Sequence, residues 1–197
     1  HIGKLVLEPR EDDLVMVSSH LLMQRQIGVM EISAYTIQVE PSRKPTYTFD
    51  PKASYLLSGG MGGLGRSTAR WMASRGAKHL ILLSRSGTAR PAAQELMKDL
   101  AAAGVTAHAP QCDVSDRTVL EKVLDECSKM MPPIKGCVQG SMVLKDAIFS
   151  NMTEEDYYTA VRPKVIASRN LHELLTHDMD FFILLSSASG VVGNRGQ

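Results

Sequence analysis

A cluster of glycines near residue 60 constrains the fold more than any other feature of this sequence. Five of the eight residues of 58–65 are glycine. The apolar run 55–57 precedes the cluster, and apolar side chains recur at helical spacing through 64–75. Glycines let a backbone turn tightly and approach a ligand, and a helix N-terminus attracts anions. A strand that passes into a helix through glycines therefore favours a dinucleotide-binding turn. The alternative is a turn that only packs the helix on the strand.

The remaining sequence repeats the alternation of strand and helix. Short apolar runs typical of buried strands occupy 79–84, 106–114, 134–139 and 181–186. Helical patterns lie between them at 91–103, 116–130 and 153–175, the first opened by a proline and followed by a glycine. Each crossover must return the chain over the sheet, so this order predicts an α/β fold with a doubly wound parallel sheet.

Both ends of the sequence suggest a longer polypeptide. The chain starts at His1 without methionine, and residues 1–50 carry strand-like runs at Lys4–Leu7 and Tyr35–Val39 followed by a polar, proline-bearing linker. A doubly wound sheet usually has further strands after the fifth. We therefore expect a sheet that is truncated at its C-terminus.

Composition narrows the classes of partner. The net charge is +1 with no block of basic residues, which gives no support to a nucleic-acid partner. No apolar run approaches the roughly 20 residues that span a bilayer. The three cysteines lack CxxC spacing and no signal peptide precedes them, which predicts buried or half-buried thiols in a reducing compartment and a cytoplasmic location.

The residues after the second strand indicate the cofactor. Sites that bind NAD place a carboxylate about 20 residues after the glycines, where it accepts hydrogen bonds from the ribose. This sequence has Ser84-Arg85-Ser86 there. A guanidinium pairs well with a phosphate, so the segment favours NADPH. The alternative is a surface arginine in a loop. Asp113, at the end of the third strand, either accepts from the adenine amino group or caps the turn into the next helix.

These residues resemble the ketoreductase domains of polyketide synthases, within the short-chain dehydrogenase/reductase superfamily. The resemblance extends from about Phe49 to Gln197. It depends on five segments, which are 55–66, 82–87, Asp113-Val114, 162–165 and 185–190. Segments 138–144 and 191–197 are most similar to the highly reducing, iterative synthases of fungi. Residues 2–7 resemble the last strand of an enoylreductase domain, which implies a boundary between residues 1–50 and a Rossmann-type ketoreductase domain at 51–197.

The resemblance implies a reaction and a set of site residues. The reaction is NADPH-dependent reduction of a β-ketoacyl thioester carried by the phosphopantetheine of an acyl carrier protein, with other synthase domains in the same polypeptide. Ser187 and Lys164 match the catalytic serine and lysine. The family's tyrosine and asparagine fall beyond Gln197, so we expect the isolated chain to be inactive. The residues expected to contact the cofactor are Ser58, Gly59, Gly60, Gly62, Gly63, Leu64, Gly65, Ser84, Arg85, Ser86, Asp113, Val114 and Gly140.

Two segments depart from the family pattern. Gln139–Met142 stands where many relatives have a histidine-alanine-alanine-glycine run, and Leu144-Lys145-Asp146 stands where some bacterial relatives have leucine-aspartate-aspartate. We therefore make no prediction about the stereochemistry of the alcohol. Without the resemblance, Ser187 would be expected only to cap its own turn through its hydroxyl, and Lys164 would be expected to be a solvated lysine on a helix. Two other functions remain as alternatives, a non-catalytic half-ketoreductase scaffold and a free-standing reductase.

Five further residues are assigned structural roles. His172 has no second histidine or cysteine pair at metal-binding spacing, so a packing or surface role is expected and no metal site is predicted. Trp71 and Met72 are expected in the core of the first helix. Glu154 and Glu155 are expected to complement the dipole at a helix N-terminus.

Overall fold

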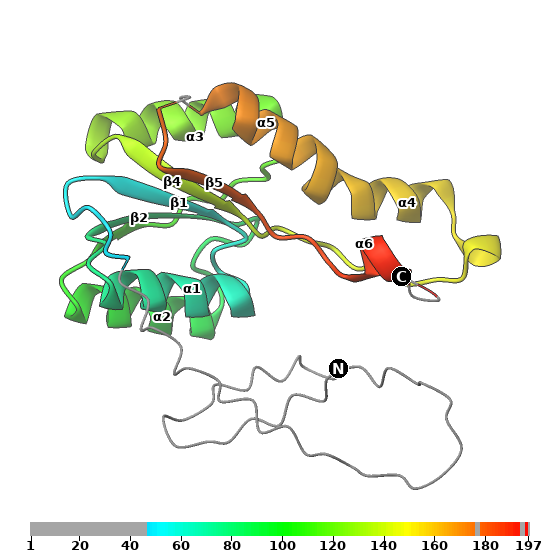
Figure 1. The fold of residues 1–197 in the computed structure, drawn as a ribbon, viewed down its shortest axis with the longest axis horizontal. Coiled ribbons are helices and arrows are strands. Elements are labelled where there is room, and N and C mark those ends of the chain that lie inside the picture. Colours follow the sequence, from blue (N-terminus) through cyan, green and yellow to red (C-terminus); the bar gives the residue numbers. More distant parts are fainter. Residues whose placement is uncertain (1–46, 176–177, 194–195, 197) are drawn as a thin grey trace, which may run out of the picture. The chain divides into compact units, whose positions relative to one another are not determined.

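The computed structural model describes residues 47–175, 178–193 and 196, and contains a five-stranded parallel sheet of order β3-β2-β1-β4-β5 (Figure 1). The strands are β1 (Ser54–Ser58), β2 (His79–Leu83), β3 (Thr106–His108), β4 (Ile134–Gln139) and β5 (Phe181–Leu184). The helices are α1 (Gly63–Ser74), α2 (Pro91–Ala102), α3 (Arg117–Met130), α4 (Glu154–Val161), α5 (Ala167–Leu174) and α6 (Ser189–Val192). A 3₁₀ turn, Phe149–Asn151, precedes α4, and a π-helical turn, Arg162–Ile166, joins α4 to α5. This confirms the predicted doubly wound α/β fold. The strand-like runs at Lys4–Leu7 and Tyr35–Val39 lie outside the described residues.

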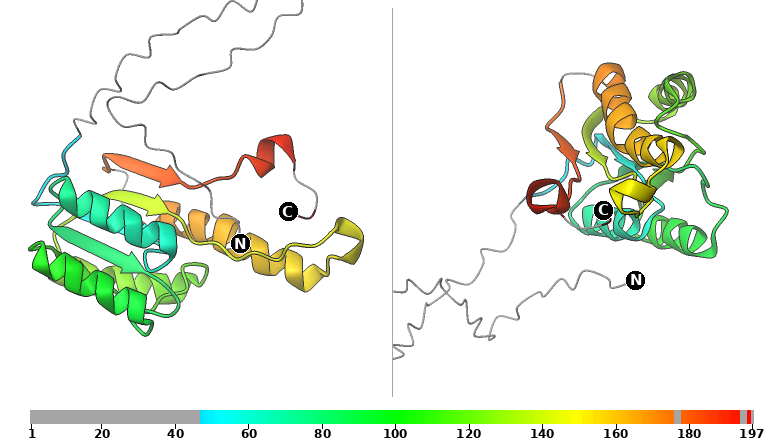
Figure 2. Two further views of the ribbon diagram at one scale, coloured as in Figure 1. Left: turned by 90° about the horizontal axis from the view of Figure 1, so that it is seen from below. Right: turned by 90° about the vertical axis from the view of Figure 1, so that its right-hand side faces the viewer.

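Helices cover both faces of the sheet. Helices α1 and α2 lie on one face, and α3 and α5 lie on the other (Figures 1 and 2). Side chains of a strand point alternately to the two faces, so Tyr55 and Leu57 pack toward α1 and α2 while Leu56 packs toward α3 and α5. All five residues of β1 are buried. Burial on both sides explains why the apolar residues of β1 and β2 follow one another without alternation.

Two predicted elements differ from those observed by more than two residues or in continuity, whereas the other bounds agree within two residues. The third strand was expected over 106–114 but ends at His108, two residues before Pro110, which has no N–H for the ladder. A single bridge between Ser84 and Gln111 continues the pairing. The helix expected over 153–175 is interrupted by the π-helical turn, which contains Pro163. Proline cannot donate the helical hydrogen bond at its position, so the interruption falls there.

The helix termini follow the sequence signals. The Asp116 carboxylate accepts from the N–H of Val119 at 3.1 Å, and the Thr153 hydroxyl accepts from the N–H of Asp156 at 3.1 Å. Glu154 and Glu155 lie in the first turn of α4, where they complement the helix dipole as predicted. Gly104 follows α2 with φ of +67°, a left-handed conformation that glycine adopts without strain.

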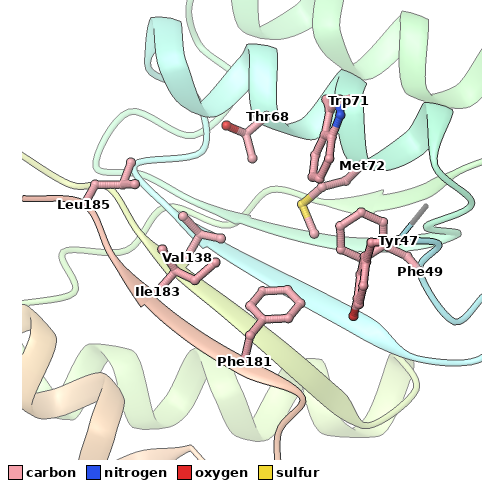
Figure 3. Close-up of a pocket in the computed structure, with 9 residues that line it drawn as sticks. All are labelled: Tyr47, Phe49, Thr68, Trp71, Met72, Val138, Phe181, Ile183 and Leu185. Carbon is pink, nitrogen blue, oxygen red and sulfur yellow. The ribbon is translucent and has the colours of Figure 1, made fainter. Parts of the chain in front are cut away.

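The expectation for Trp71 is wrong, whereas that for Met72 is confirmed. Met72 is 1% exposed, but Trp71 is 44% exposed. Figure 3 shows both side chains at a pocket of about 370 Å³ between α1 and strands β4 and β5. Phe49, Phe181 and apolar side chains of β5 line its other walls. The helical spacing of apolar residues placed Trp71 on the apolar side of the helix. It did not show that a pocket lies between this helix and the edge of the sheet.

Burial raises the pKa of all three cysteine thiols. Cys112, Cys127 and Cys137 are all buried, as predicted. Burial raises the pKa of Cys112 and of Cys127 to about 11, and that of Cys137 to about 12. Because the thiolate is the nucleophile, we expect iodoacetamide at neutral pH to label none of them in the folded chain and all three in urea. Mass spectrometry of a labelling time course measures this, and rapid labelling of any cysteine without urea would contradict it.

Among the described residues, no helix combines the length and apolar character that a membrane crossing requires.

Candidate active site

The candidate site lies at the carboxyl ends of β1, the central strand, and of its neighbour β4. From these strands the chain leads away in different directions, because β1 continues into α1 on one face and β4 continues toward α4 and α5 on the other (Figure 1). The Gly140 N–H donates to the Ser58 carbonyl at 2.9 Å, which joins the two strand ends. Open parallel sheets bind ligands at such a point.

Three glycines of the loop after β1 are required by close packing. Gly59 has φ of +75°, and a Cβ there would lie 2.9 Å from the Ser141 nitrogen. A Cβ on Gly60 would lie 2.9 Å from the Leu57 oxygen, and one on Gly65 would lie 2.7 Å from the Gly60 Cα. Real Cβ atoms do not approach so closely, so these positions hold the loop against β4 and against the start of α1.

Gly63 differs from these three glycines, because close packing within the described chain does not require glycine at this position. A Cβ on Gly63 would meet no atom of the described residues within 4 Å. Gly63 begins α1 after Gly62, and no described side chain caps this terminus or adds an acidic residue to its first turn. The Leu64 side chain is 66% exposed. Open space beside uncapped N–H groups suits an anionic ligand.

Hydroxyl groups with no partner border the same loop. The Oγ atoms of Ser58 and Ser84 are buried and have no hydrogen-bond partner among the described residues. Buried polar atoms normally have one, so these two suit a polar ligand at the ends of β1 and β2. Arg85 is exposed and Ser86 is half-buried, immediately after Ser84.

The residues after β3 already have structural roles. The Asp113 carboxylate accepts from the Ser115 N–H at 2.9 Å and from the Ser115 hydroxyl at 2.7 Å. This is the turn-capping alternative, and Asp113 is also exposed. The Val114 side chain is buried, and its carbonyl accepts from the Asn170 amide at 3.0 Å. Both residues therefore stabilise the turn that leads from β3 into α3.

Lys164 projects from the π-helical turn to the end of β5. Its ammonium group donates to the Leu185 carbonyl at 2.8 Å, and the residue is half-buried. Burial lowers the pKa of this amine below its ordinary value. The alternative of a solvated helix lysine therefore does not describe this residue. The lysine instead brings a positive charge to the strand end that leads into Ser187.

Ser187 follows Leu185 by two residues and is exposed. Its Oγ accepts from the Ser189 N–H at 3.2 Å, so the hydroxyl caps the turn into α6. This capping uses an oxygen lone pair and leaves the hydroxyl proton available for donation. The structure thus places the two catalytic residues implied by the resemblance, Lys164 and Ser187, at the same end of β5.

Comparison with known families identifies this arrangement. A model of the KR domain family matches residues 53–197. The chain belongs to the ketoreductase domain family of polyketide synthases. Ketoreductases are oxidoreductases that use a nicotinamide cofactor.

Curated relatives of this ketoreductase are fungal synthases. Highly reducing polyketide synthase 40 of Fusarium mangiferae is 75% identical over the whole chain. The 6-hydroxymellein synthase of Talaromyces verruculosus is 48% identical over 82% of the chain. The chain spans 7% of the length of the first protein and 6% of the second.

Solved ketoreductases have the same fold. The ketoreductase from the first module of phoslactomycin biosynthesis in Streptomyces aligns with a TM-score of 0.71 and 37% identity, covering 77% of this chain and 36% of that one. The first ketoreductase of the tylosin synthase aligns with a TM-score of 0.69 and 32% identity, covering 78% of this chain and 33% of that one.

The ketoreductase site also contains two residues that sequence reasoning did not assign. Gln139, at the end of β4, is 1% exposed, and its side-chain amide donates to the Pro163 carbonyl at 2.6 Å. The Ser141 hydroxyl lies 2.8 Å from the same carbonyl. Both belong to the segment that departs from the family pattern, and that departure was the available signal.

Proposed function

We propose that this ketoreductase reduces a β-ketoacyl thioester on an acyl carrier protein to a β-hydroxyacyl thioester, with NADPH as reductant. One observation carries the proposal. The half-buried ammonium of Lys164 contacts the carbonyl of Leu185, two residues before Ser187, at the same edge of the sheet as the glycine loop. A positive charge and a hydroxyl at this edge suit a reaction in which a carbonyl oxygen gains negative charge.

The glycine loop and the end of β2 fit NADPH. The open space at Gly63 and the uncapped start of α1 suit a pyrophosphate, and Ser58 offers an unpartnered hydroxyl. Arg85, with Ser84 and Ser86 on either side, suits the additional phosphate of NADPH. Bound NADPH supplies the hydride.

The chain's own polar groups would act on the substrate carbonyl and its proton donor. Ser187 can donate a hydrogen bond to the carbonyl oxygen as negative charge develops there. The positive charge of Lys164 favours the anionic form of a nearby proton donor, which is a tyrosine in the family resemblance. A proton donor with a lowered pKa gives up its proton more readily, so it protonates the alkoxide efficiently.

The relatives support a carrier-bound substrate. They are polyketide synthases of which this chain spans a small fraction, so the acyl carrier protein and other synthase domains in the same polypeptide are the proposed partners. A cytoplasmic location is also part of the proposal, because Cys112, Cys127 and Cys137 are free thiols, as is typical of proteins in reducing compartments.

A reduction assay tests the proposal directly. The full-length protein is mixed with NADPH and a β-ketoacyl thioester, and the β-hydroxyacyl product is measured by mass spectrometry. We expect product that depends on NADPH. A protein that folds but forms no product, with either a carrier-bound or a free thioester, would support the non-catalytic scaffold instead.

Replacing Arg85 by alanine tests the choice of cofactor. Loss of a charge-assisted bond to phosphate is expected to weaken NADPH binding about tenfold or more, and to leave NADH binding nearly unchanged. The dissociation constants are measured by cofactor fluorescence with the folded protein. Arg90→Ala, at an exposed arginine before α2, is the matched control. Equal losses for NADPH and NADH would remove Arg85 from the phosphate site.

A further inference from the structure

The turn that carries Lys164 has an altered hydrogen-bond pattern. The N–H of Ala167 donates to the carbonyl of Arg162, five residues back. In a regular α-helix this N–H would pair with the carbonyl of Pro163. The π-helical turn therefore releases the Pro163 carbonyl from its α-helical partner, next to Lys164 in the chain.

Two side chains from the end of β4 contact the released carbonyl. The Gln139 amide nitrogen lies 2.6 Å from it, and the Ser141 hydroxyl lies 2.8 Å from it. The Gln139 side-chain oxygen accepts from the Ser141 N–H at 3.2 Å. Because a carbonyl only accepts and an N–H only donates, the Gln139 amide satisfies both in one orientation.

Gln139 is also joined to the other contact of Lys164. Its main-chain carbonyl accepts from the Leu185 N–H at 3.0 Å, and the Leu185 carbonyl accepts from the Lys164 ammonium at 2.8 Å. A closed circuit therefore runs from Gln139 to Leu185, to Lys164, to Pro163 and back to Gln139. Gln139 thus determines the position of both the backbone beside Lys164 and the strand end that its ammonium contacts.

We propose that Gln139 is a positioning residue, whose side-chain amide holds the Pro163 carbonyl and thereby fixes Lys164 at the carboxyl end of β5. Ser141 supports the same contact. Gln139 acts through Lys164 and has no contact with the reacting atoms in this proposal. The expected effect of Gln139 on the rate of reduction rests on the proposed function of Lys164. The expected effect of Gln139 on the position of Lys164 does not.

The structural consequence is tested on the folded chain without any substrate. Gln139→Met keeps the length of the side chain and removes its hydrogen bonds. We expect Lys164 to loosen and its amine to become hydrated, so its pKa rises toward 10.5 from its lowered value. NMR titration of carbon-13-labelled lysine measures this shift. Gln94→Met, at an exposed glutamine of α2, is the matched control and should leave Lys164 unchanged.

The kinetic consequence is tested in the full-length protein. A misplaced Lys164 is expected to lower kcat for reduction on the order of tenfold in Gln139→Met. The dissociation constant for NADPH should change less than about twofold, because the glycine loop and Arg85 remain in place. If Gln139→Met only destabilised the fold, it would lower the amount of folded enzyme and leave kcat per folded molecule unchanged.

The possible outcomes separate this inference from the proposed function. A folded Gln139→Met protein with the wild-type Lys164 pKa and wild-type kcat overturns the inference. If Gln139→Met does not fold, Ser141→Ala replaces it, with a smaller shift of the Lys164 pKa in the same direction expected and no shift overturning the inference. If the wild-type protein reduces no ketone, the proposed function fails, and the titration alone still decides whether Gln139 positions Lys164.

Discussion

Replacing Lys164 by methionine is expected to lower the rate of ketone reduction by about two powers of ten or more, the scale for losing one positioned catalytic group. The apolar stem of the lysine is retained by methionine, so packing in the π-helical turn is preserved and the positive charge is lost. The charge is effective because Lys164 is half-buried, where an electrostatic interaction is screened less than in water. The measurement is steady-state reduction of a β-ketoacyl thioester by the full-length protein.

A matched control separates this effect from a general loss of charge. Lys122 is exposed on α3, which packs on the face of the sheet opposite α1, and Lys122→Met should leave kcat unchanged. Thermal unfolding of both variants checks that they are equally folded. If Lys164→Met keeps the wild-type rate in a folded protein, Lys164 is not part of the catalytic machinery.

Replacing Gly65 by alanine is expected to destabilise the chain by about 3 kcal/mol, the scale of overpacking at a site that cannot expand. The new Cβ would lie 2.7 Å from both the Cα and the carbonyl oxygen of Gly60. These are backbone atoms of a loop that bonds to the Leu83 carbonyl through the N–H groups of Gly59 and Gly60, so the loop cannot move aside easily. Urea unfolding followed by circular dichroism measures the loss as a lower transition midpoint.

Gly63 provides the matched control for Gly65. An added Cβ at Gly63 meets open space, and alanine favours a helix over glycine by about 1 kcal/mol. Gly63→Ala is therefore expected to fold at least as stably as the wild type but to bind NADPH more weakly, because the methyl group occupies the space proposed for the pyrophosphate. An unchanged affinity for NADPH in Gly63→Ala would place the pyrophosphate elsewhere.

The main features of the fold could be read from local sequence. Apolar runs of strand length, helical periodicity and the glycines between them predicted the order of strands and helices and the parallel sheet. These signals are local because a strand buried on both faces must be apolar at nearly every residue. The two elements that differed most did so at prolines, Pro110 after β3 and Pro163 before α5. A missing N–H changes where an element ends without changing what kind of element it is.

Only part of the candidate active site could be predicted from the sequence. Glycine spacing identified the loop after β1, and Ser84-Arg85-Ser86 indicated the cofactor phosphate, because both depend on residues adjacent in the chain. Lys164 and Ser187 were assigned through the family resemblance, since neither has a local signal of its own. Gln139 had no assigned role, because its partners Pro163 and Leu185 are distant in sequence and meet it only in the folded chain.

Neighbouring residues and backbone sterics encode the parallel sheet, the glycine loop and the basic residue that follows β2, so these features can be recognised in the linear chain. Folding was needed to reveal that Gly63 faces open space while Gly65 is packed, that Trp71 borders a pocket, and that Lys164 is held between Leu185 and the turn bound by Gln139. Those properties depend on which distant backbone atoms lie within a few ångströms, and the sheet order brings these atoms together.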